Sequence, residues 1–201
     1  IYTKTQARPI EVVSQGLKEI EAEIGDRIEI MGVGTTGSGR ELIGELINAD
    51  TIKDEITCHK TGAMHISQNH TNKSVDTIFD IGGQDSKFIS LEDVVVVDFT
   101  MNEACAAGTG SFLEEQAEKL GINIKEEFAK LAFDSASPIR LGERCTVFME
   151  KEITPYLQRG AEKKDIVAGL AYSIVTNYLN RVVRGRRLGN VIYFQGGTAY
   201  N

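Results

Sequence analysis

The segment from Asp80 to Lys87 has the sequence Asp-Ile-Gly-Gly-Gln-Asp-Ser-Lys, which contains the residue types that bind a nucleotide phosphate and its metal ion. Glycines lack a side chain, so backbone N–H groups at Gly82 and Gly83 can approach a phosphate closely. The carboxylates of Asp80 and Asp85 are oxygen ligands of the kind that Mg²⁺ prefers. We therefore expect a phosphate and magnesium site here. The alternative is a plain hairpin turn with solvated aspartates.

A second glycine pair, Gly196 and Gly197, follows the apolar run from Val191 to Phe194. Such a turn can lie flat against an adenine or a ribose because no Cβ intervenes. It lies far along the chain from the first glycine pair, as expected for the two halves of one nucleotide cleft. We therefore expect it to bind the adenosine part of a nucleotide.

A third glycine-rich segment follows the pattern Gly-x-Gly-x-x-Gly at Gly32, Gly34 and Gly37. It is not a Walker A loop, because Arg40 and Glu41 stand where a Lys followed by Ser or Thr is required. The acidic Asp54 follows these glycines at a sequence separation that suits the residue that binds the ribose in a dinucleotide-binding unit. Dinucleotide binding therefore stays open as an alternative.

The chain has three cysteines, Cys58, Cys105 and Cys145, whose odd number and wide spacing exclude a secreted disulfide framework. We expect Cys105 and Cys145 each to lie near the first turn of a helix, where the helix dipole favours a thiolate. The alternative is that Cys105 and Cys145 are small buried residues that only pack in the core. An iron–sulfur cluster normally takes four thiolates, which two identical chains would supply on a dimer axis. Cys58 has no further ligands nearby and is expected to be structural.

The elements that must position these groups form an α/β pattern of hairpins followed by helices. The expected strands span residues 28–33, 76–81, 87–90, 94–99 and 191–194. The expected helices span residues 9–24, 42–47, about 105–120, 145–157 and 165–184. The phosphate turn then lies between two hairpin strands, and the second glycine pair ends the last strand.

The composition excludes several classes of protein. The chain has 201 residues, of which 41% are hydrophobic, so it can form one large domain or two lobes. Its net charge of -7 and the absence of a dense basic cluster beyond residues 184–187 argue against nucleic acid as a partner. No stretch approaches the roughly 20 apolar residues of a membrane span, and no signal peptide is visible. We expect a cytoplasmic protein without a membrane partner.

Four ordered segments, residues 80–87, 101–110, 145–150 and 194–201, resemble the BadF/BadG/BcrA/BcrD ATPase family. More closely, they are similar to the activators, or ATP-dependent reductase components, of 2-hydroxyacyl-CoA dehydratases such as 2-hydroxyglutaryl-CoA dehydratase. The resemblance implies an actin-like ATPase fold. This fold belongs to the acetate kinase, sugar kinase, heat-shock chaperone and actin superfamily, in which two ribonuclease H-like lobes hold ATP between them.

The resemblance also implies the roles of individual residues. The implied catalytic residues are Asp80, Gln84 and Asp85. The residues implied to bind ATP or ADP, together with Mg²⁺, are Gly82, Gly83, Lys87, Gly108, Thr109, Gly110, Gly196 and Gly197. Cys105 and Cys145 are the implied ligands of one 4Fe-4S cluster shared by the two subunits of a homodimer. ATP hydrolysis would then drive a low-potential electron to a 2-hydroxyacyl-CoA dehydratase or a related reductase component.

The same resemblance predicts the division of the chain. Residues 1–74 are expected to be the remainder of a first lobe that lacks its first phosphate motif. Residues 75–201 are expected to be a second lobe without its C-terminal end, so the chain is expected to be a fragment. Two alternatives stay open: a sugar-kinase-like or chaperone-like ATPase whose cysteines only pack, and a non-catalytic dimerisation module.

Overall fold

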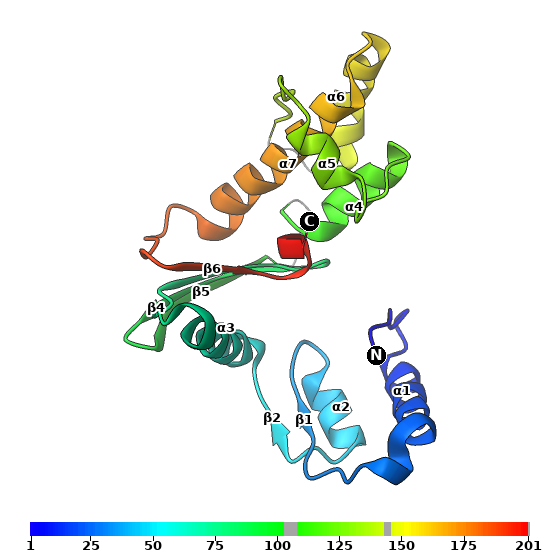
Figure 1. Cartoon of the computed structure of the whole chain (residues 1–201), viewed down its shortest axis with the longest axis vertical. Coiled ribbons are helices and arrows are strands. Elements are labelled where there is room, and N and C mark those ends of the chain that lie inside the picture. Colours follow the sequence, from blue (N-terminus) through cyan, green and yellow to red (C-terminus); the bar gives the residue numbers. More distant parts are fainter. Residues whose placement is uncertain (103–107, 143–145, 201) are drawn as a thin grey trace. The chain divides into compact units, whose positions relative to one another are not determined.

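The computed structural model describes residues 1–102, 108–142 and 146–200 (Figure 1). The chain divides into two compact units, residues Ile1–Gly62 and Ala63–Asn201. The second unit contains the four-stranded sheet and most of the buried apolar residues. It therefore contains the segments from which a nucleotide site was predicted.

The first unit is a small βαβ arrangement preceded by a long helix. Helix α1, Pro9–Ile24, has proline at its first position, where the missing N–H costs no hydrogen bond. Strand β1, Gly34–Thr35, pairs in parallel with β2, Thr51–Ile52, and α2, Arg40–Leu46, connects them. Gly44 is buried in α2. Glycine is required at this position because a Cβ there would lie 2.6 Å from the Ile52 side chain.

The expected strand over residues 28–33 is wrong. Pairing begins only at Gly34, because no neighbouring strand lies along the preceding residues in the described part of the chain. The contact with the β2 side of the unit begins at Val33, whose carbonyl accepts a hydrogen bond from Asp50 N at 2.9 Å. Ile30 and Met31 are 67% and 85% exposed. Alternating apolar residues alone do not make a strand when no partner edge is present.

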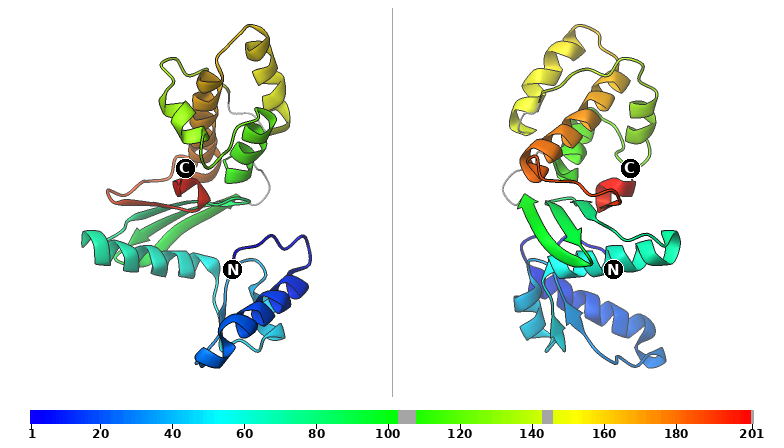
Figure 2. Two further views of the ribbon diagram at one scale, coloured as in Figure 1. Left: turned by 45° about the vertical axis from the view of Figure 1, so that its right-hand side comes forward. Right: turned by 90° about the vertical axis from the view of Figure 1, so that its left-hand side faces the viewer.

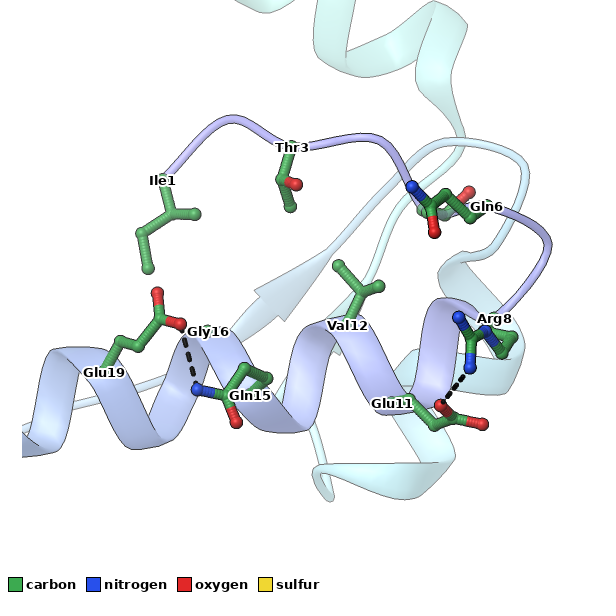
Figure 3. A pocket seen from close by; sticks show the side chains of 10 residues that line it. Ile1, Thr3, Gln6, Arg8, Glu11, Val12, Gln15, Gly16 and Glu19 are labelled. Carbon is green, nitrogen blue, oxygen red and sulfur yellow. Dashed lines mark hydrogen bonds and ion pairs between the residues drawn. The ribbon is translucent and has the colours of Figure 1, made fainter.

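The segment before α1 folds back along that helix and encloses a shallow pocket of about 310 Å³ (Figure 3). Arg8 and Glu11 form an exposed ion pair of 3.3 Å at one end of it. Gln15 donates to Glu19 at 2.9 Å at the other end. Both contacts join exposed side chains on the surface of α1. The residues named here therefore bring no buried polar groups together in this pocket.

The sheet of the second unit has the strand order β5-β4-β3-β6. Strands β3, Thr77–Ile81, β4, Ser86–Glu92, and β5, Val95–Asn102, form two consecutive antiparallel hairpins. Strand β6, Ile192–Gln195, returns from the end of the chain and pairs in parallel with β3. The predicted hairpins and final strand are therefore confirmed.

Helices lie on both faces of this sheet (Figures 1 and 2). One face carries α4, Gly110–Lys119, α5, Phe128–Phe133, α6, Thr146–Gln158, and α7, Lys163–Tyr178. A π-helical turn, Leu179–Val183, continues α7. The other face carries the C-terminal part of α3, Glu55–Thr71. Helices α3 and α5 were not predicted, because α3 is polar over most of its surface and α5 has only six residues.

A single apolar core fixes α4, α6 and α7 to the sheet. Its buried members include Ile81, Phe88, Phe112, Met149, Ile166 and Leu170. Burial of one such side chain contributes about 1.5 to 3 kcal/mol to folding. The core therefore holds the start of α4 against the turn between β3 and β4. No helix in the described residues combines the length and hydrophobicity that crossing a bilayer requires.

Candidate nucleotide site

Asp80, Asp85 and Lys87 form a charged cluster at the β3–β4 hairpin. Asp80 lies directly opposite Lys87 in the sheet, and its Oδ2 is 3.6 Å from the Lys87 Nζ. The Asp85 Oδ2 is 2.6 Å from the same Nζ. Asp80 and Lys87 are buried, whereas the Asp85 side chain is 33% exposed. Two carboxylates thus converge on one point, and one of them faces solvent.

The turn that joins the two strands contains Gly82 and Gly83, and both of its carbonyls are bound by the start of α4. Gly110 N donates to Gly82 O at 2.8 Å, and Ser111 N donates to Gly83 O at 2.8 Å. A Cβ at Gly110 would lie 3.1 Å from Gly82 O. The glycines at 82, 83 and 110 therefore permit a close backbone contact between the turn and the helix.

This contact determines where the remaining N–H groups of the turn point. In a planar trans peptide the C=O and the N–H point in opposite directions. Because the carbonyls of Gly82 and Gly83 point at α4, the N–H groups of Gly83 and Gln84 point away from it. Neither N–H donates to another described residue, and both residues are exposed. Successive free N–H groups of this kind bind anionic oxygens.

The end of β6 brings the second glycine pair to the same turn. Gln195 lies beside Asp80 in the parallel register, and its Nε2 donates to Asp80 Oδ1 at 3.3 Å. Thr198 Oγ1 donates to Ile81 O at 3.0 Å. Gly196 has φ +95°, and a Cβ on it would collide with the Ile81 carbonyl. Only glycine fits where the chain crosses the end of β3 this closely.

Tyr178 of α7 contacts the charged cluster through the backbone of Lys87. Its hydroxyl donates to the Lys87 carbonyl at 2.7 Å, and its ring contacts Phe79 edge-on with centroids 5.1 Å apart. Burial raises the pKa of the Tyr178 hydroxyl above its ordinary value, and the negative charge of Asp80 raises it further. The phenol therefore stays protonated at neutral pH and remains a hydrogen-bond donor. It fixes the backbone of the lysine whose ammonium lies between the carboxylates.

Most residues predicted for the nucleotide site lie close together in the structure. The hairpin turn, the start of α4 and the turn after β6 meet through the contacts described above. Gly108 and Thr109 immediately precede α4 and are buried, and Thr109 Oγ1 lies 3.0 Å from Ser111 Oγ. Gly197 begins a 3₁₀ turn, Gly197–Tyr200, and a Cβ on it would contact nothing within 4 Å.

Several residues of this site were not predicted from the sequence. They are Gln195, Thr198 and Tyr178. The pairing of Asp80 with Gln195 depends on the parallel register of β3 and β6, which no local pattern reveals. Tyr178 lies within the predicted helix over residues 165–184, but apolar spacing along a helix does not show where a tyrosine hydroxyl points. Lys87 was predicted to bind the cofactor, and its ammonium is bound to Asp85 in this structure.

The cysteine prediction falls outside the described residues, because neither Cys105 nor Cys145 is among them. The expected helix from about Cys105 is nevertheless wrong at its start. Gly108 has φ +93°, which no helix accommodates, and α4 begins at Gly110. Helix α6 begins at Thr146, directly after Cys145. Among the described residues, no group of three or more His, Cys, Asp or Glu side chains could hold a metal ion.

The dinucleotide pattern of the first unit is not a phosphate loop. Gly34 lies inside strand β1, so the three glycines do not form one loop between a strand and a helix. Asp54 caps the start of α3 instead of reaching toward a ribose. Its Oδ1 accepts from Thr57 N at 2.8 Å, and its Oδ2 accepts from Thr57 Oγ1 at 2.7 Å. These two hydrogen bonds hold the pKa of Asp54 below its usual value.

Comparison with known proteins gives one consistent family. The model of the BadF/BadG/BcrA/BcrD ATPase family matches residues 2–201. The (R)-2-hydroxyglutaryl-CoA dehydratase activating ATPase of Acidaminococcus fermentans is 36% identical over 166 residues, which are 83% of this chain and 60% of that protein. The chain spans between 47% and 62% of the length of three curated relatives that it matches.

Two solved structures give the fold. Component A of the A. fermentans (R)-2-hydroxyglutaryl-CoA dehydratase has a TM-score of 0.77 at 31% identity, covering 98% of this chain and 72% of that chain. The activator of the 2-hydroxyisocaproyl-CoA dehydratase from Clostridium difficile with bound ADPNP has a TM-score of 0.78 at 31% identity, covering 94% and 67%. The chain has the actin-like ATPase fold of these activators, as the sequence resemblance implied.

Proposed function

Because the chain belongs to the BadF/BadG/BcrA/BcrD ATPase family, we propose that the whole protein is an ATP-hydrolysing iron–sulfur activator. It drives low-potential electron transfer to a 2-hydroxyacyl-CoA dehydratase or a related reductase component. The observation that carries this proposal is the meeting of the Gly82-Gly83 turn, the start of α4 and the Gly196–Thr198 turn. Two of these segments carry the predicted phosphate and adenosine residues. The ADPNP bound to the C. difficile activator supports a nucleotide there.

In the proposed site the turn N–H groups of Gly83 and Gln84 bind phosphate oxygens, and Gly196 and Gly197 lie against the adenosine. Lys87 supplies positive charge to the developing negative charge on the phosphates. Hydrolysis forms a bond between a water oxygen and the γ-phosphorus, breaks the bond to the β-phosphate oxygen, and releases one proton. Asp80 and Gln84 orient that water, because phosphoryl transfer requires alignment more than covalent chemistry.

The donor set of the hairpin fits Mg²⁺. Asp80 and Asp85 supply carboxylate oxygens, and the Asp85 side chain is partly exposed beside the Lys87 ammonium that both carboxylates contact. Both are hard ligands, and the cluster of two carboxylates and one ammonium has a formal charge of -1, which suits a cation. When bound, the metal would neutralise phosphate charge. The protein groups that hold it would be Asp85, which reaches solvent, and Asp80 behind it.

The redox part of the proposal rests on Cys105 and Cys145. They would hold one 4Fe-4S cluster between the two subunits of a homodimer, since one chain has too few cysteines for four thiolate ligands. The cluster would supply the electron that the partner enzyme receives. The proposed partner is a 2-hydroxyacyl-CoA dehydratase or a related reductase, in keeping with the activating ATPase of A. fermentans.

The test is anaerobic purification of the whole protein, followed by assays of iron, ATP hydrolysis and reduction of a 2-hydroxyacyl-CoA dehydratase component. We expect bound iron and electron transfer that requires ATP and stops with a non-hydrolysable analogue. ATP hydrolysis without bound iron would overturn the redox part and leave a plain ATPase. Absence of nucleotide binding by calorimetry would overturn both and favour a dimerisation module.

A further inference from the structure

The Gly196–Thr198 turn is bound to the end of β3 on both of its sides. Just before the turn, Gln195 Nε2 donates to Asp80 Oδ1 at 3.3 Å. At the end of the turn, Thr198 Oγ1 donates to Ile81 O at 3.0 Å. Between these two contacts lies Gly196, whose lack of a Cβ leaves room for the Ile81 backbone. Two side chains from one short segment are therefore bound to consecutive residues of β3.

The first of these contacts acts on the carboxylate of Asp80. Gln195 Nε2 binds one oxygen of this carboxylate, and the other oxygen lies 3.6 Å from the Lys87 ammonium. Gln195 belongs to β6 and Lys87 to β4, the two strands that flank β3. The last torsion of an aspartate is otherwise broad. The orientation of the Asp80 carboxylate is therefore set from both neighbouring strands.

The second contact acts on the backbone that leads into the hairpin turn. Thr198 binds the carbonyl of Ile81, the residue directly before Gly82. The same side chain lies close to the start of α4, because a Cβ on Gly110 would be 3.4 Å from Thr198 Cγ2. Gly110 N in turn donates to Gly82 O at 2.8 Å. Thr198 thus borders all three segments that meet in the candidate site.

We propose that Gln195 and Thr198 are positioning residues that couple the binding of adenosine to the alignment of Asp80 and the hairpin turn. The inference rests on the proposed function, which places adenosine against Gly196 and Gly197 and the phosphates at the hairpin turn. Adenosine that orders the Gly196–Thr198 turn also fixes the two contacts to β3. Binding energy from a remote part of the substrate then serves alignment at the reacting centre, so it raises kcat more than it lowers KM.

The first test is steady-state ATP hydrolysis by the whole protein. Thr198→Val keeps the shape of the side chain and removes its hydroxyl, whereas Thr198→Ser keeps the hydroxyl. Gln195→Met keeps the length of the side chain and removes the donor. We expect Thr198→Val and Gln195→Met to lower kcat by about tenfold or more and to change KM by less than about threefold. Thr198→Ser should keep most of the wild-type kcat.

The matched control is Thr176→Val. Thr176 Oγ1 donates to Tyr172 O at 2.8 Å on α7, so this variant also removes a hydrogen bond from a hydroxyl to a backbone carbonyl in the same unit. It should hydrolyse ATP with the kcat and KM of the wild type. A rise in KM at unchanged kcat in Thr198→Val would mean that the turn only binds the nucleotide, and would overturn the coupling. If Thr198→Val does not fold, Gln195→Met decides the same question.

The second test requires neither hydrolysis nor iron. Gly110 N and Ser111 N donate to carbonyls of the hairpin turn, so the hydrogen exchange of these two amides reports the opening of that turn. Adenosine, which carries no phosphate, should slow this exchange about fivefold or more in the wild type. It should have no such effect in Thr198→Val or Gln195→Met. Equal slowing in the wild type and both variants, or no slowing in the wild type, would overturn the coupling.

The outcomes separate this inference from the proposed function. A whole protein that binds no iron or hydrolyses no ATP refutes the proposed function, and the exchange measurement still tests the coupling. Wild-type kcat in both Thr198→Val and Gln195→Met overturns the coupling and leaves the activator proposal intact.

Discussion

Asp80 on β3 and Lys87 on β4 face each other across the sheet as a buried ion pair of 3.6 Å, and Asp85 binds the same ammonium at 2.6 Å. A buried pair adds little stability as a unit, but removal of one partner leaves the other as an uncompensated buried charge. Lys87 is therefore the cation on which both carboxylates converge.

Lys87→Met should destabilise the protein by about 3 to 5 kcal/mol in urea unfolding at pH 7, because two carboxylates lose their shared cation. The matched control is Lys119→Met, which removes an exposed partner of Glu115 and should cost less than about 1 kcal/mol. Equal unfolding midpoints for the two variants would contradict the buried cluster.

Asp80→Asn in the whole protein should slow ATP turnover by about 100-fold or more, because an aligned charge in a phosphoryl-transfer site is lost. Affinity for ATP, measured by calorimetry, should change far less. Asp93→Asn, in the turn between β4 and β5, is the control and should hydrolyse ATP at the wild-type rate. Unchanged turnover in Asp80→Asn would refute the catalytic assignment.

Gly196→Ala should destabilise the fold by about 2 to 4 kcal/mol, because a Cβ would meet the Ile81 carbonyl and φ is +95°. Gly197→Ala tests the neighbouring residue, where a Cβ meets nothing within 4 Å, and should change stability by less than about 1 kcal/mol. Thermal unfolding of both variants checks the difference. Similar melting temperatures would show that the turn after β6 does not pass the end of β3 as closely as described.

Tyr178→Phe should cost about 1 kcal/mol, because it removes the hydrogen bond to Lys87 O and keeps the ring contact with Phe79. Tyr172→Phe removes a hydroxyl from a side chain that is 67% exposed and should cost less than about 0.5 kcal/mol. Urea unfolding measures both. A larger loss of unfolding free energy in Tyr172→Phe than in Tyr178→Phe would contradict the buried hydrogen bond from Tyr178 to Lys87 O.

Asp54 gives a prediction for pH. Its folded pKa lies below the ordinary value because Thr57 donates two hydrogen bonds to it. Its contribution to stability is therefore present above the unfolded pKa of about 4 and is lost as pH falls through the lower folded value. Asp54→Ala should be less stable than wild type at pH 7 and approach it at pH 2 to 3. A difference that stayed constant with pH would exclude the capping carboxylate.

Cys105→Ser or Cys145→Ser should abolish iron binding in the anaerobically reconstituted whole protein, because either change removes two of the four ligands in a dimer. Cys58→Ser should keep the wild-type content of about two iron atoms per chain, half of a four-iron cluster. Iron analysis and visible absorbance measure the content. Full retention of iron by Cys105→Ser would exclude the shared cluster.

The sequence predicted the elements of the second unit better than those of the first. The β-type run 76–81 and the apolar spacing of 165–184 match elements that contribute Ile81, Ile166 and Leu170 to the core of that unit. The run 94–99 also forms a strand, although most of its side chains are exposed. Residues 28–33 show the same alternation but find no strand beside them, so the pattern failed where tertiary pairing was absent. Helix α3 was missed because Ala63 and Ser67, two of its buried residues, are small and not strongly apolar.

The glycine pairs of the candidate site were predictable because close backbone approach requires that residue type. Their partners were not. That Gly110 N and Ser111 N donate to Gly82 O and Gly83 O depends on how α4 packs, which is set by residues as distant as Phe112 and Leu170. Gln195 and Tyr178 likewise enter the site through sheet register and helix rotation, which leave no local signal.

The two hydrogen bonds between the glycine turn and α4 also have a mechanical consequence. They join the turn and the first residues of the helix into one rigid piece, so the turn cannot be displaced without either breaking both bonds or moving α4 with it. The residue just before that helix start, Thr109, follows Gly108, which rests on the backbone of Asn177 and Tyr178. A displacement of the glycine turn would therefore move α4 and shift Gly108 against the backbone of α7 at Asn177 and Tyr178.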